Sequence, residues 1–331
     1  MLSFAIALMT SYLVTKKWIE IARRRGLVGK DMNKEGDIKV AEAGGIGFIM
    51  GLAMGLLFMV AVNAFVYDNM SSIVYLLASL SVALMAAFVG FVDDVLGWKK
   101  GLSHRAKVIS TLPIAVPLMA VKAGVSRMKI PFIGSIDLGI AYPLVVVPVG
   151  VVGAANAFNM IAGLNGLEAS MSLIINGTLA VIALTHKAWI SFAVAMSVLG
   201  ATLGFWIWNK YPAKVFPGDV FTYTSGALIA TIAILGNMEG PALMLFIPYF
   251  IELMLYIRGK LNGVEKESWG VPRGGCLEPP YDKCYSVTHV AMKILKKVKG
   301  CATEKEVVLL INAFEAVLAI IVLYLYVFRG W

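Results

Sequence analysis

The sequence predicts an all-α polytopic membrane protein. Hydrophobic residues make up 59% of the 331 residues and charged residues only 15%, and the mean hydropathy is +0.81. Soluble proteins of this length carry a larger share of charged residues, so the composition indicates several membrane spans. The two-residue alternation of membrane β-strands does not recur along the chain, and helices are therefore the expected spans.

Ten apolar segments predict about ten transmembrane helices in a single integral membrane domain, residues 1–331. Each segment is long enough to cross about 30 Å of hydrocarbon as a helix. In the first segment, the positive charges Lys16, Lys17 and Arg23 follow the apolar run, which is the reverse of a secretory leader. The segments are residues 1–20, 44–66, 73–92, 107–124, 141–160, 169–185, 190–208, 220–237, 241–257 and 306–328.

The distribution of positive charge predicts the orientation of these spans. If ten spans alternate, one side of the membrane receives the joints 21–43, 93–106, 161–168, 209–219 and 258–305. Of the 29 lysines and arginines, the opposite side receives only Lys122, Arg127, Lys129, Lys187 and Arg329. The first side is therefore expected to be cytoplasmic. The net charge of +9 gathers there, where it reflects topology and anionic lipids or attracts a polyanionic substrate.

The cytoplasmic loop 258–305 contains the pattern of an amphipathic helix. At about 100° per residue, one side is polar and one side is apolar. We expect this helix to lie in the membrane interface, with docking on the spans as the alternative. The apolar side carries Val287, Val290, Ala291, Ile294, Leu295 and Val298, and the polar side carries His289, Lys293, Lys296, Lys297 and Lys299.

Three further features receive structural interpretations. The cysteines fall in a loop expected to face a reducing compartment, so free thiols are expected at Cys276, Cys284 and Cys301. Within the spans, Glu252 is expected to snorkel to the interface or to pair with Arg258, and Glu315, with Asn312 one turn earlier, to bridge helices or a dimer contact. On the outer side, residues 128–139 alternate weakly around a glycine and predict a small external hairpin.

The strongest functional pattern is the stretch Asn156-Ala-Phe-Asn-Met-Ile-Ala-Gly-Leu-Asn-Gly-Leu-Glu168. It places asparagines, glycines and a glutamate within and just after an apolar segment. Carboxamides are costly in hydrocarbon, and glycine lets the backbone approach a ligand closely. The stretch therefore predicts a polar ligand site at a membrane face.

Three other polar clusters fall in cytoplasmic joints or at adjoining ends of spans: Asp93-Asp94, Phe216-Pro-Gly-Asp219, and Lys34 with Glu42. Each has a structural alternative when taken alone, such as a solvated helix end, a helix cap or a polar loop. Together they suit Mg2+ held by one or two carboxylates plus substrate phosphates, which is the equipment for phosphoryl transfer. The sequence lacks the GxxxxGKS and GxGxxG loops of soluble nucleotide-binding folds.

In this order, over roughly residues 30–260, the motifs resemble those of the polyprenyl-phosphate N-acetylhexosamine-1-phosphate transferases. The Ala162-Gly-Leu-Asn-Gly-Leu-Glu168 form is similar to the eukaryotic and archaeal branch, the UDP-GlcNAc:dolichyl-phosphate GlcNAc-1-phosphate transferases. The resemblance implies a ten-helix plan and one reaction. A dolichyl phosphate oxygen attacks the sugar-bearing phosphorus of UDP-GlcNAc, UMP leaves, and GlcNAc-diphospho-dolichol forms as the first lipid-linked intermediate of N-glycosylation.

The resemblance also implies roles for single residues. Asp219 and Asn159 would contact Mg2+, with Mn2+ as the alternative, and Asp93 and Asp94 would orient or deprotonate the lipid phosphate. The implied catalytic set is Asp93, Asp94, Lys107, Asn159 and Asp219. The implied substrate-binding set is Lys34, Glu42, Asn156, Gly163, Asn165, Glu168, Phe216 and Arg273.

Within the substrate-binding set, Phe216 would stack on uracil and Asn165 would bond its edge, while Lys34 and Lys107 would hold phosphates. Arg273 would contact the diphosphate. Its surroundings, Pro272-Arg-Gly-Gly-Cys276, depart from the Arg-x-Arg typical of eukaryotic relatives, and this departure bears on recognition of the sugar.

The expected partners are UDP-GlcNAc, dolichyl or another polyprenyl phosphate and membrane lipids, with no nucleic acid and with a homodimer as one alternative assembly. The active site is expected to face the cytoplasm, from the plasma membrane of an archaeon or the endoplasmic reticulum membrane of a eukaryote. One alternative is the same chemistry with another UDP-HexNAc or undecaprenyl phosphate. Another is a secondary transporter of an anionic metabolite, which would need a site at mid-membrane and detectable repeats.

Overall fold

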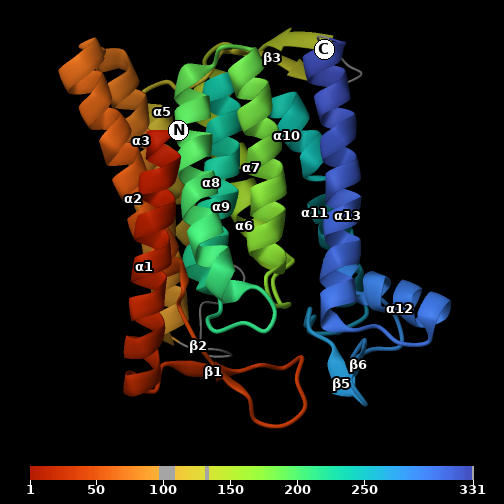
Figure 1. Cartoon of the computed structure of the whole chain (residues 1–331). Coiled ribbons are helices and arrows are strands. Elements are labelled where there is room, and N and C mark those ends of the chain that lie inside the picture. Colours follow the sequence, from red (N-terminus) through yellow and green to blue (C-terminus); the bar gives the residue numbers. More distant parts are fainter. Residues whose placement is uncertain (97–108, 131–133, 330–331) are drawn as a thin grey trace.

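A computed structural model describes residues 1–96, 109–130 and 134–329 and shows a bundle of long helices lying side by side (Figure 1). The helices are α1 (Leu2–Arg25), α2 (Gly45–Val62), α3 (Met70–Leu96), α5 (Val116–Ala120), α6 (Val147–Met160), α7 (Leu167–Thr185), α8 (Trp189–Asn209), α9 (Gly218–Gly236), α10 (Glu239–Leu245), α11 (Ile247–Leu261), α12 (Val287–Lys299) and α13 (Glu304–Leu323). Short helical turns adjoin four of them: η1 (Asn63–Tyr67), η2 (Leu112–Ala115), η3 (Tyr142–Val146) and η4 (Tyr324–Phe328).

In the described part of the chain, seven helical runs are long and apolar enough to cross a membrane. The pair α10–α11, bent by 54°, makes eight if it is counted as one span. Neither α1, which carries Lys16, Lys17 and Glu20, nor the shorter helix over residues 109–120 is among them. The chain is thus confirmed as a multi-span helical membrane protein, and the count of ten spans stays a prediction.

Helix α9 lies at the centre of the bundle, because every residue from Val220 to Ile234 is buried. Helices α2, α3, α6, α7 and α8 pack around it. Two glycines allow close approach: a Cβ on Gly90 of α3 would lie 2.4 Å from the carbonyl oxygen of Asp219, and a Cβ on Gly226 would lie 2.3 Å from the carbonyl oxygen of Ala154 in α6. Helix α9 therefore packs closely against both α3 and α6.

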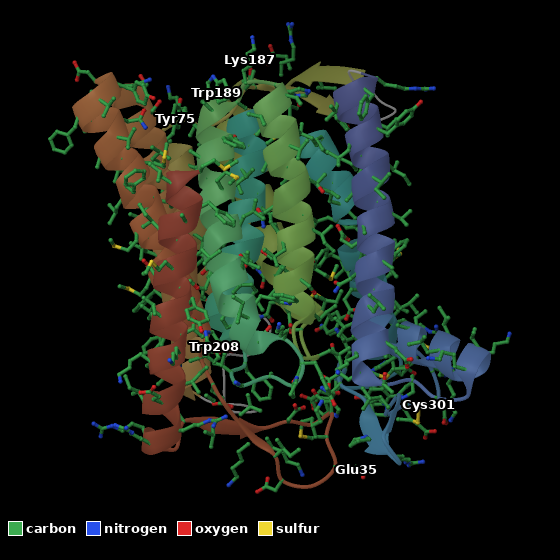
Figure 2. All side chains as sticks on the ribbon, viewed as in Figure 1. Glu35, Tyr75, Lys187, Trp189, Trp208 and Cys301 are labelled. Carbon is green, nitrogen blue, oxygen red and sulfur yellow. A yellow bond between two sulfur atoms is a disulfide. The ribbon has the colours of Figure 1, made fainter. Side chains whose placement is uncertain are left out.

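Three antiparallel hairpins cover the ends of the bundle: β1–β2 (Val28–Lys30, Lys39–Ala41), β3–β4 (Arg127–Ile130, Gly134–Asp137) and β5–β6 (Val271–Arg273, Cys276–Glu278). The hairpin β3–β4 confirms the one expected at residues 128–139, and it lies at the end of the bundle opposite β1, β5 and α12 (Figure 1). Likewise, Lys187 and Trp189 lie at the end opposite Glu35 and Cys301 (Figure 2).

In the loop 258–305, the structure corrects the expectation of free thiols and modifies the expectation of an amphipathic helix. Cys276 and Cys301 form a disulfide, with their Cα atoms 5.4 Å apart, so the expected free thiols were wrong for this pair and right only for Cys284. The pairing arises because the hairpin β5–β6 folds back beside the start of α13, 25 residues further along the chain. Spacing in the sequence does not reveal such a return.

Helix α12 occupies the stretch expected to be helical, but its two sides were assigned incompletely. His289, placed on the polar side, is fully buried, whereas Ile294 and Val298 on the apolar side are exposed. The reason is that α12 packs on the preceding loop: the side chain of Met292 lies over Gly270, and the His289 ring meets the Tyr281 ring edge-on at 5.7 Å. The lysines expected on the polar side are exposed.

Candidate active site

The first turn of α9 gathers polar groups from three helices. Asn159, in the last turn of α6, donates from Nδ2 to Asp219 Oδ1 and to Thr222 Oγ1, both at 2.8 Å. Asp94, in the last turn of α3, accepts from the backbone N–H of Asp219 at 2.8 Å and of Val220 at 3.4 Å. We name Asp94, Asn159, Asp219 and Thr222 the α9 cluster. Residues 125 positions apart in the sequence thus share one small volume.

Asp94 supplies the cap that α9 lacks within its own sequence. No side chain from the residue preceding α9 caps it, although the first N–H groups of a helix need acceptors and a negative charge is favourable there. Gly218 makes room for the carboxylate, because its φ is +66° and a Cβ would lie 2.4 Å from Asp94 Oδ2. The Pro217-Gly218 turn therefore fits α9 onto α3.

The turn between α6 and α7 is held by backbone hydrogen bonds at Gly163. Its N–H donates to Glu168 Oε1 at 2.8 Å, and its carbonyl accepts from Asn33 Nδ2 at 2.7 Å. The φ of Gly163 is +153° and that of Gly166 is +81°, values that favour glycine over residues with a side chain. The two glycines of the motif thus shape the turn that follows Asn159.

Asn165 ties the same turn to three other segments. Its Nδ2 donates to Asp31 Oδ2 at 3.2 Å, its Oδ1 accepts from the Ala213 N–H at 2.7 Å, and its own N–H donates to Glu304 Oε1 at 2.7 Å. Glu304 also pairs with Lys34. With its amide engaged on both sides and only 4% exposed, Asn165 positions loops in this structure, and its contact with uracil stays a prediction.

Lys34 is likewise engaged. Besides pairing with Glu304, its ammonium lies 3.8 Å from Asp31 and 4.2 Å from the centre of the Tyr211 ring. These contacts neutralise its charge within the protein, so phosphate binding by Lys34 stays a prediction. The residues joined by these hydrogen bonds and ion pairs form a second group, the loop cluster, which consists of Asp31, Asn33, Lys34, Gly163, Asn165, Glu168 and Glu304.

Phe216 and Glu42 lie on either side of one junction. The Phe216 N–H donates to the Ala41 carbonyl at 2.8 Å, and the Gly44 N–H donates to the Phe216 carbonyl at 2.9 Å. The Phe216 ring is partly exposed, as is Glu42, whose pKa is raised because the carboxyl group is partly buried. The loop before α9 is therefore fastened beside Glu42 and the start of α2.

The remaining expected site residues are not members of the α9 cluster. Asn156 donates to Thr111 Oγ1 at 2.9 Å and to the Val152 carbonyl at 2.8 Å. Arg273 is exposed on β5 and pairs with Glu278 of β6 at 3.2 Å; within the described ranges, no hydrogen bond or ion pair joins it to the α9 cluster. Asp93 is buried in α3. Lys107 lies outside the described residues.

Several polar residues of the site or its surroundings were missed or misassigned. Thr222 follows Asp219 by one helical turn, a spacing that could have indicated it. The sequence gives no sign that Glu304 belongs to the site, apart from its place at the start of a helix. It contacts Asn165 and Lys34 only because the chain returns to them far along the sequence. Glu252 was expected to snorkel or to pair with Arg258, and instead it is buried and pairs with Lys266. The bridge between helices expected of Glu315 and Asn312 is confirmed for Asn312, which links α13 to α7 through Ser170.

The donor atoms of the α9 cluster fit Mg2+. No group of three histidine, cysteine, aspartate or glutamate side chains among the described residues could hold a metal alone. Mg2+ instead needs only one or two carboxylates, and completes its shell with water and substrate phosphates. Asp219 offers a carboxylate, and Asn159, whose nitrogen is engaged, offers its amide oxygen. The absence of thiol and imidazole donors from the cluster does not suit zinc.

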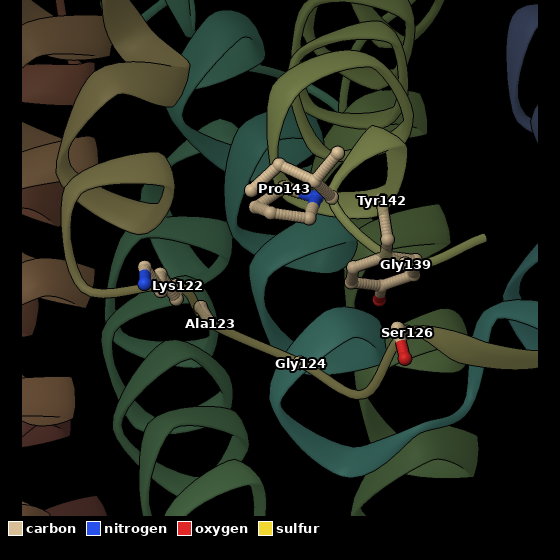
Figure 3. Close-up of a pocket in the computed structure, with 8 residues that line it drawn as sticks. Lys122, Ala123, Gly124, Ser126, Gly139, Tyr142 and Pro143 are labelled. Atoms are coloured by element: carbon tan, nitrogen blue, oxygen red, sulfur yellow. The ribbon is translucent and has the colours of Figure 1, made fainter. Parts of the chain in front are cut away.

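Two cavities among the described residues lie away from the α9 cluster. One of about 290 Å³ is lined by Lys122, Gly124, Tyr142 and Pro143 beside the hairpin β3–β4 (Figure 3). That hairpin is at the end of the bundle away from β1, β5 and α12 (Figure 1). These lining residues include no member of the α9 cluster, so this cavity belongs to a different part of the molecule.

Fold and site together define a multi-span helical membrane protein with an oxygen-rich polar site at the ends of its helices. The profile described as glycosyl transferase family 4 matches residues 75–237. A Saccharolobus solfataricus protein, provisionally named a UDP-N-acetylglucosamine–dolichyl-phosphate N-acetylglucosaminephosphotransferase, is 37% identical over 330 residues, which are 98% of this chain and 96% of that protein. The chain belongs to glycosyl transferase family 4.

Two other relatives agree with this assignment. A Sulfolobus acidocaldarius protein with the same provisional name is 32% identical over 97% of this chain and 94% of its own length. A Bacillus subtilis protein, provisionally named an undecaprenyl-phosphate N-acetylglucosaminyl 1-phosphate transferase, is 29% identical over 78% of this chain and 72% of its own length. The resemblance drawn from the four motifs is therefore confirmed.

Proposed function

We propose that this protein transfers N-acetylglucosamine 1-phosphate from UDP-GlcNAc to dolichyl or another polyprenyl phosphate and releases UMP. The observation that carries the proposal is the α9 cluster, in which Asn159 and Asp94 both contact the first turn of α9. The names of the two archaeal relatives, which align over nearly the whole chain, support the same substrates.

The reaction replaces one phosphorus–oxygen bond by another. An oxygen of the lipid phosphate bonds to the phosphorus that carries GlcNAc. The bond from that phosphorus to the bridging oxygen breaks, and UMP leaves with this oxygen. A phosphate monoester has a second pKa of about 6, so the attacking group is already largely ionised at neutral pH. Positioning and charge neutralisation, rather than a strong base, therefore carry most of the rate enhancement.

Asp219 and Asn159 are the residues that would hold Mg2+, or Mn2+ in its place. When bound, the ion would neutralise charge on the diphosphate. Asp94 holds Asp219 at the start of α9 through its backbone N–H, and Asn159 orients the Asp219 carboxylate. The chain thereby fixes the carboxylate before substrate arrives, which lowers the ordering required during reaction.

We place this site at the cytoplasmic face of a protein with ten spans. The asymmetric distribution of lysine and arginine along the sequence supports this orientation. In addition, Lys187, one of the few positive charges assigned to the outer side, lies at the end of the bundle opposite Cys301 (Figure 2).

A second candidate keeps the chemistry and changes a substrate. The Bacillus subtilis relative is named for undecaprenyl phosphate, and Arg273 lies exposed on a hairpin that departs from the familiar Arg-x-Arg pattern. A transporter is disfavoured, because transporter sites lie near mid-membrane, whereas the α9 cluster is formed by the last turns of α3 and α6 and the first turn of α9.

The decisive experiment incubates the purified protein with UDP-GlcNAc, Mg2+ and either dolichyl or undecaprenyl phosphate. We expect UMP in solution and a lipid product heavier by GlcNAc phosphate, measured by mass spectrometry, with the Asp219→Ala variant as the inactive control. Release of UDP would instead indicate transfer of the sugar alone and would overturn the proposal. The better lipid acceptor decides between the two candidates.

A further inference from the structure

A buried ion pair lies beside the end of α6, outside the α9 cluster. The side chain of Glu252, in α11, is completely buried, and that of Lys266, in the following loop, is 6% exposed. Lys266 Nζ donates to Glu252 Oε1 and also to the carbonyl oxygen of Met160 at 2.6 Å. Met160 is the last residue of α6 and directly follows Asn159.

Both charges of this pair are well satisfied. Glu252 also accepts from the Ser286 hydroxyl at 3.0 Å and from the Val287 N–H at 2.6 Å, so it caps the start of α12. A lysine at the C-terminal end of α6 is favourable, because the last carbonyls of a helix lack partners and carry partial negative charge. A buried ion pair is weak evidence for stability by itself, so the contact with Met160 points to positioning of the last turn of α6 rather than to stability.

The loop that carries Lys266 makes a second hydrogen bond to the Met160 carbonyl. The Ser268 hydroxyl donates to the same carbonyl at 3.4 Å, and the Ser268 carbonyl accepts from Thr288 Oγ1 in α12 at 2.6 Å. The Gly270 N–H donates to Asn33 Oδ1 at 2.9 Å, and Asn33 in turn holds Gly163. The loop therefore fixes the chain on both sides of the turn that follows Asn159.

We infer that Lys266 is a positioning residue for Asn159. By holding the Met160 carbonyl, its ammonium fixes the last turn of α6 and so the direction in which the Asn159 amide points toward Asp219 and Thr222. Glu252 holds the Lys266 side chain in place through the ion pair. Lys266 acts through the backbone and does not touch the reacting atoms. This inference rests on the proposed function, in which Asn159 serves the diphosphate site.

The test compares Lys266→Gln, Lys266→Arg and, as the matched control, Lys260→Gln, which removes an exposed lysine from the end of α11. Turnover is measured as UMP release, and amide hydrogen exchange of residues 156–163 is measured without substrate. We expect Lys266→Gln to lower turnover about 10- to 100-fold, as loss of a group that orients a ligand commonly does, and to speed exchange in this segment. Lys266→Arg should retain more of both properties, and Lys260→Gln should match the wild type.

The outcomes separate this inference from the proposed function. A wild-type protein without UMP release refutes the function, while the exchange measurement still tests the contact with Met160. With an active wild type, the inference is overturned if Lys266→Gln keeps full turnover, or if it loses turnover with unchanged exchange in residues 156–163. If Lys266→Gln fails to fold, the pair Glu252→Gln/Lys266→Gln replaces it, because no unpaired buried charge remains; full turnover of that pair likewise overturns the inference.

Discussion

Replacing Gly90 by alanine tests whether the packing of α3 on α9 sets the geometry of the site. A Cβ at this position would lie 2.4 Å from the carbonyl carbon and oxygen of Asp219 and from the backbone nitrogen of Val220, whereas ordinary contacts begin at 3.4 Å. Because backbone atoms cannot rotate away, the helices must separate by about 1 Å, and a misplacement of that size can cost about 10²-fold in rate. Asp94 lies one turn beyond Gly90, so its hydrogen bonds to the first turn of α9 would lengthen as well.

The assay is UMP release by Gly90→Ala, compared with Gly177→Ala in α7. Gly177 has open space where a Cβ would be, so alanine there should leave turnover unchanged and improve the helix slightly. Gly90→Ala should lower turnover by about 10²-fold and lower the free energy of unfolding by about 1–3 kcal/mol, as overpacking does. Turnover of Gly90→Ala within twofold of the wild type would refute the claim that this helix crossing fixes Asp219.

Three further predictions concern individual side chains. Asp219→Ala should lower turnover by about 10²-fold or more, as loss of an electrostatic group commonly does, and Asp93→Asn by less, because the lipid phosphate is already ionised; equal losses at pH 7.5 would contradict this reasoning. Glu304→Ala leaves Lys34 with only the more distant Asp31 carboxylate and removes the acceptor of the Asn165 N–H, so the free energy of unfolding in detergent should fall by about 1–3 kcal/mol, and an unchanged thermal midpoint would refute the pairing. Burial lowers the pKa of His289 to about 4 from 6.5, so the folded state binds fewer protons than the unfolded state, and stability should be complete above about pH 6.5 and decline toward pH 4. The thermal midpoint of His289→Gln should fall less between pH 7 and pH 5 than that of the wild type; parallel declines would count against a neutral buried ring.

Composition and motif order were enough to predict the membrane class, the family and the residues of the α9 cluster other than Thr222. The membrane class and the cluster rest on local properties, namely apolar length for each span and residue types that a polar site at a membrane face requires, whereas the family rests on the resemblance of the motifs. The partner of Asp94 was beyond such reasoning, because its contact with the Asp219 N–H depends on how closely Gly90 lets α3 approach α9. No pattern within α3 encodes that distance.

The wrong predictions share one cause, which is the return of the loop 258–305 against the bundle. Arg258 is near Glu252 in the sequence, yet the loop brings Lys266 to Glu252 instead. The same return joins Cys276 to Cys301 and buries His289. The hairpins β1–β2 and β5–β6 also escaped notice, because three-residue strands are too short to show alternation.

The arrangement of the site separates two tasks. Asp94, Asn159 and Asp219 lie on the ends of long helices that pack closely in the bundle, where a side chain is held more precisely than on a loop. Arg273, by contrast, lies on an exposed hairpin fastened to the chain just before α13 by Cys276 and Cys301. The side chains on the helices can therefore keep their positions while residues of the hairpin change. In the resemblance drawn from the sequence, the motifs on α3, α6 and α9 carry the match, and the stretch around Arg273 departs from it.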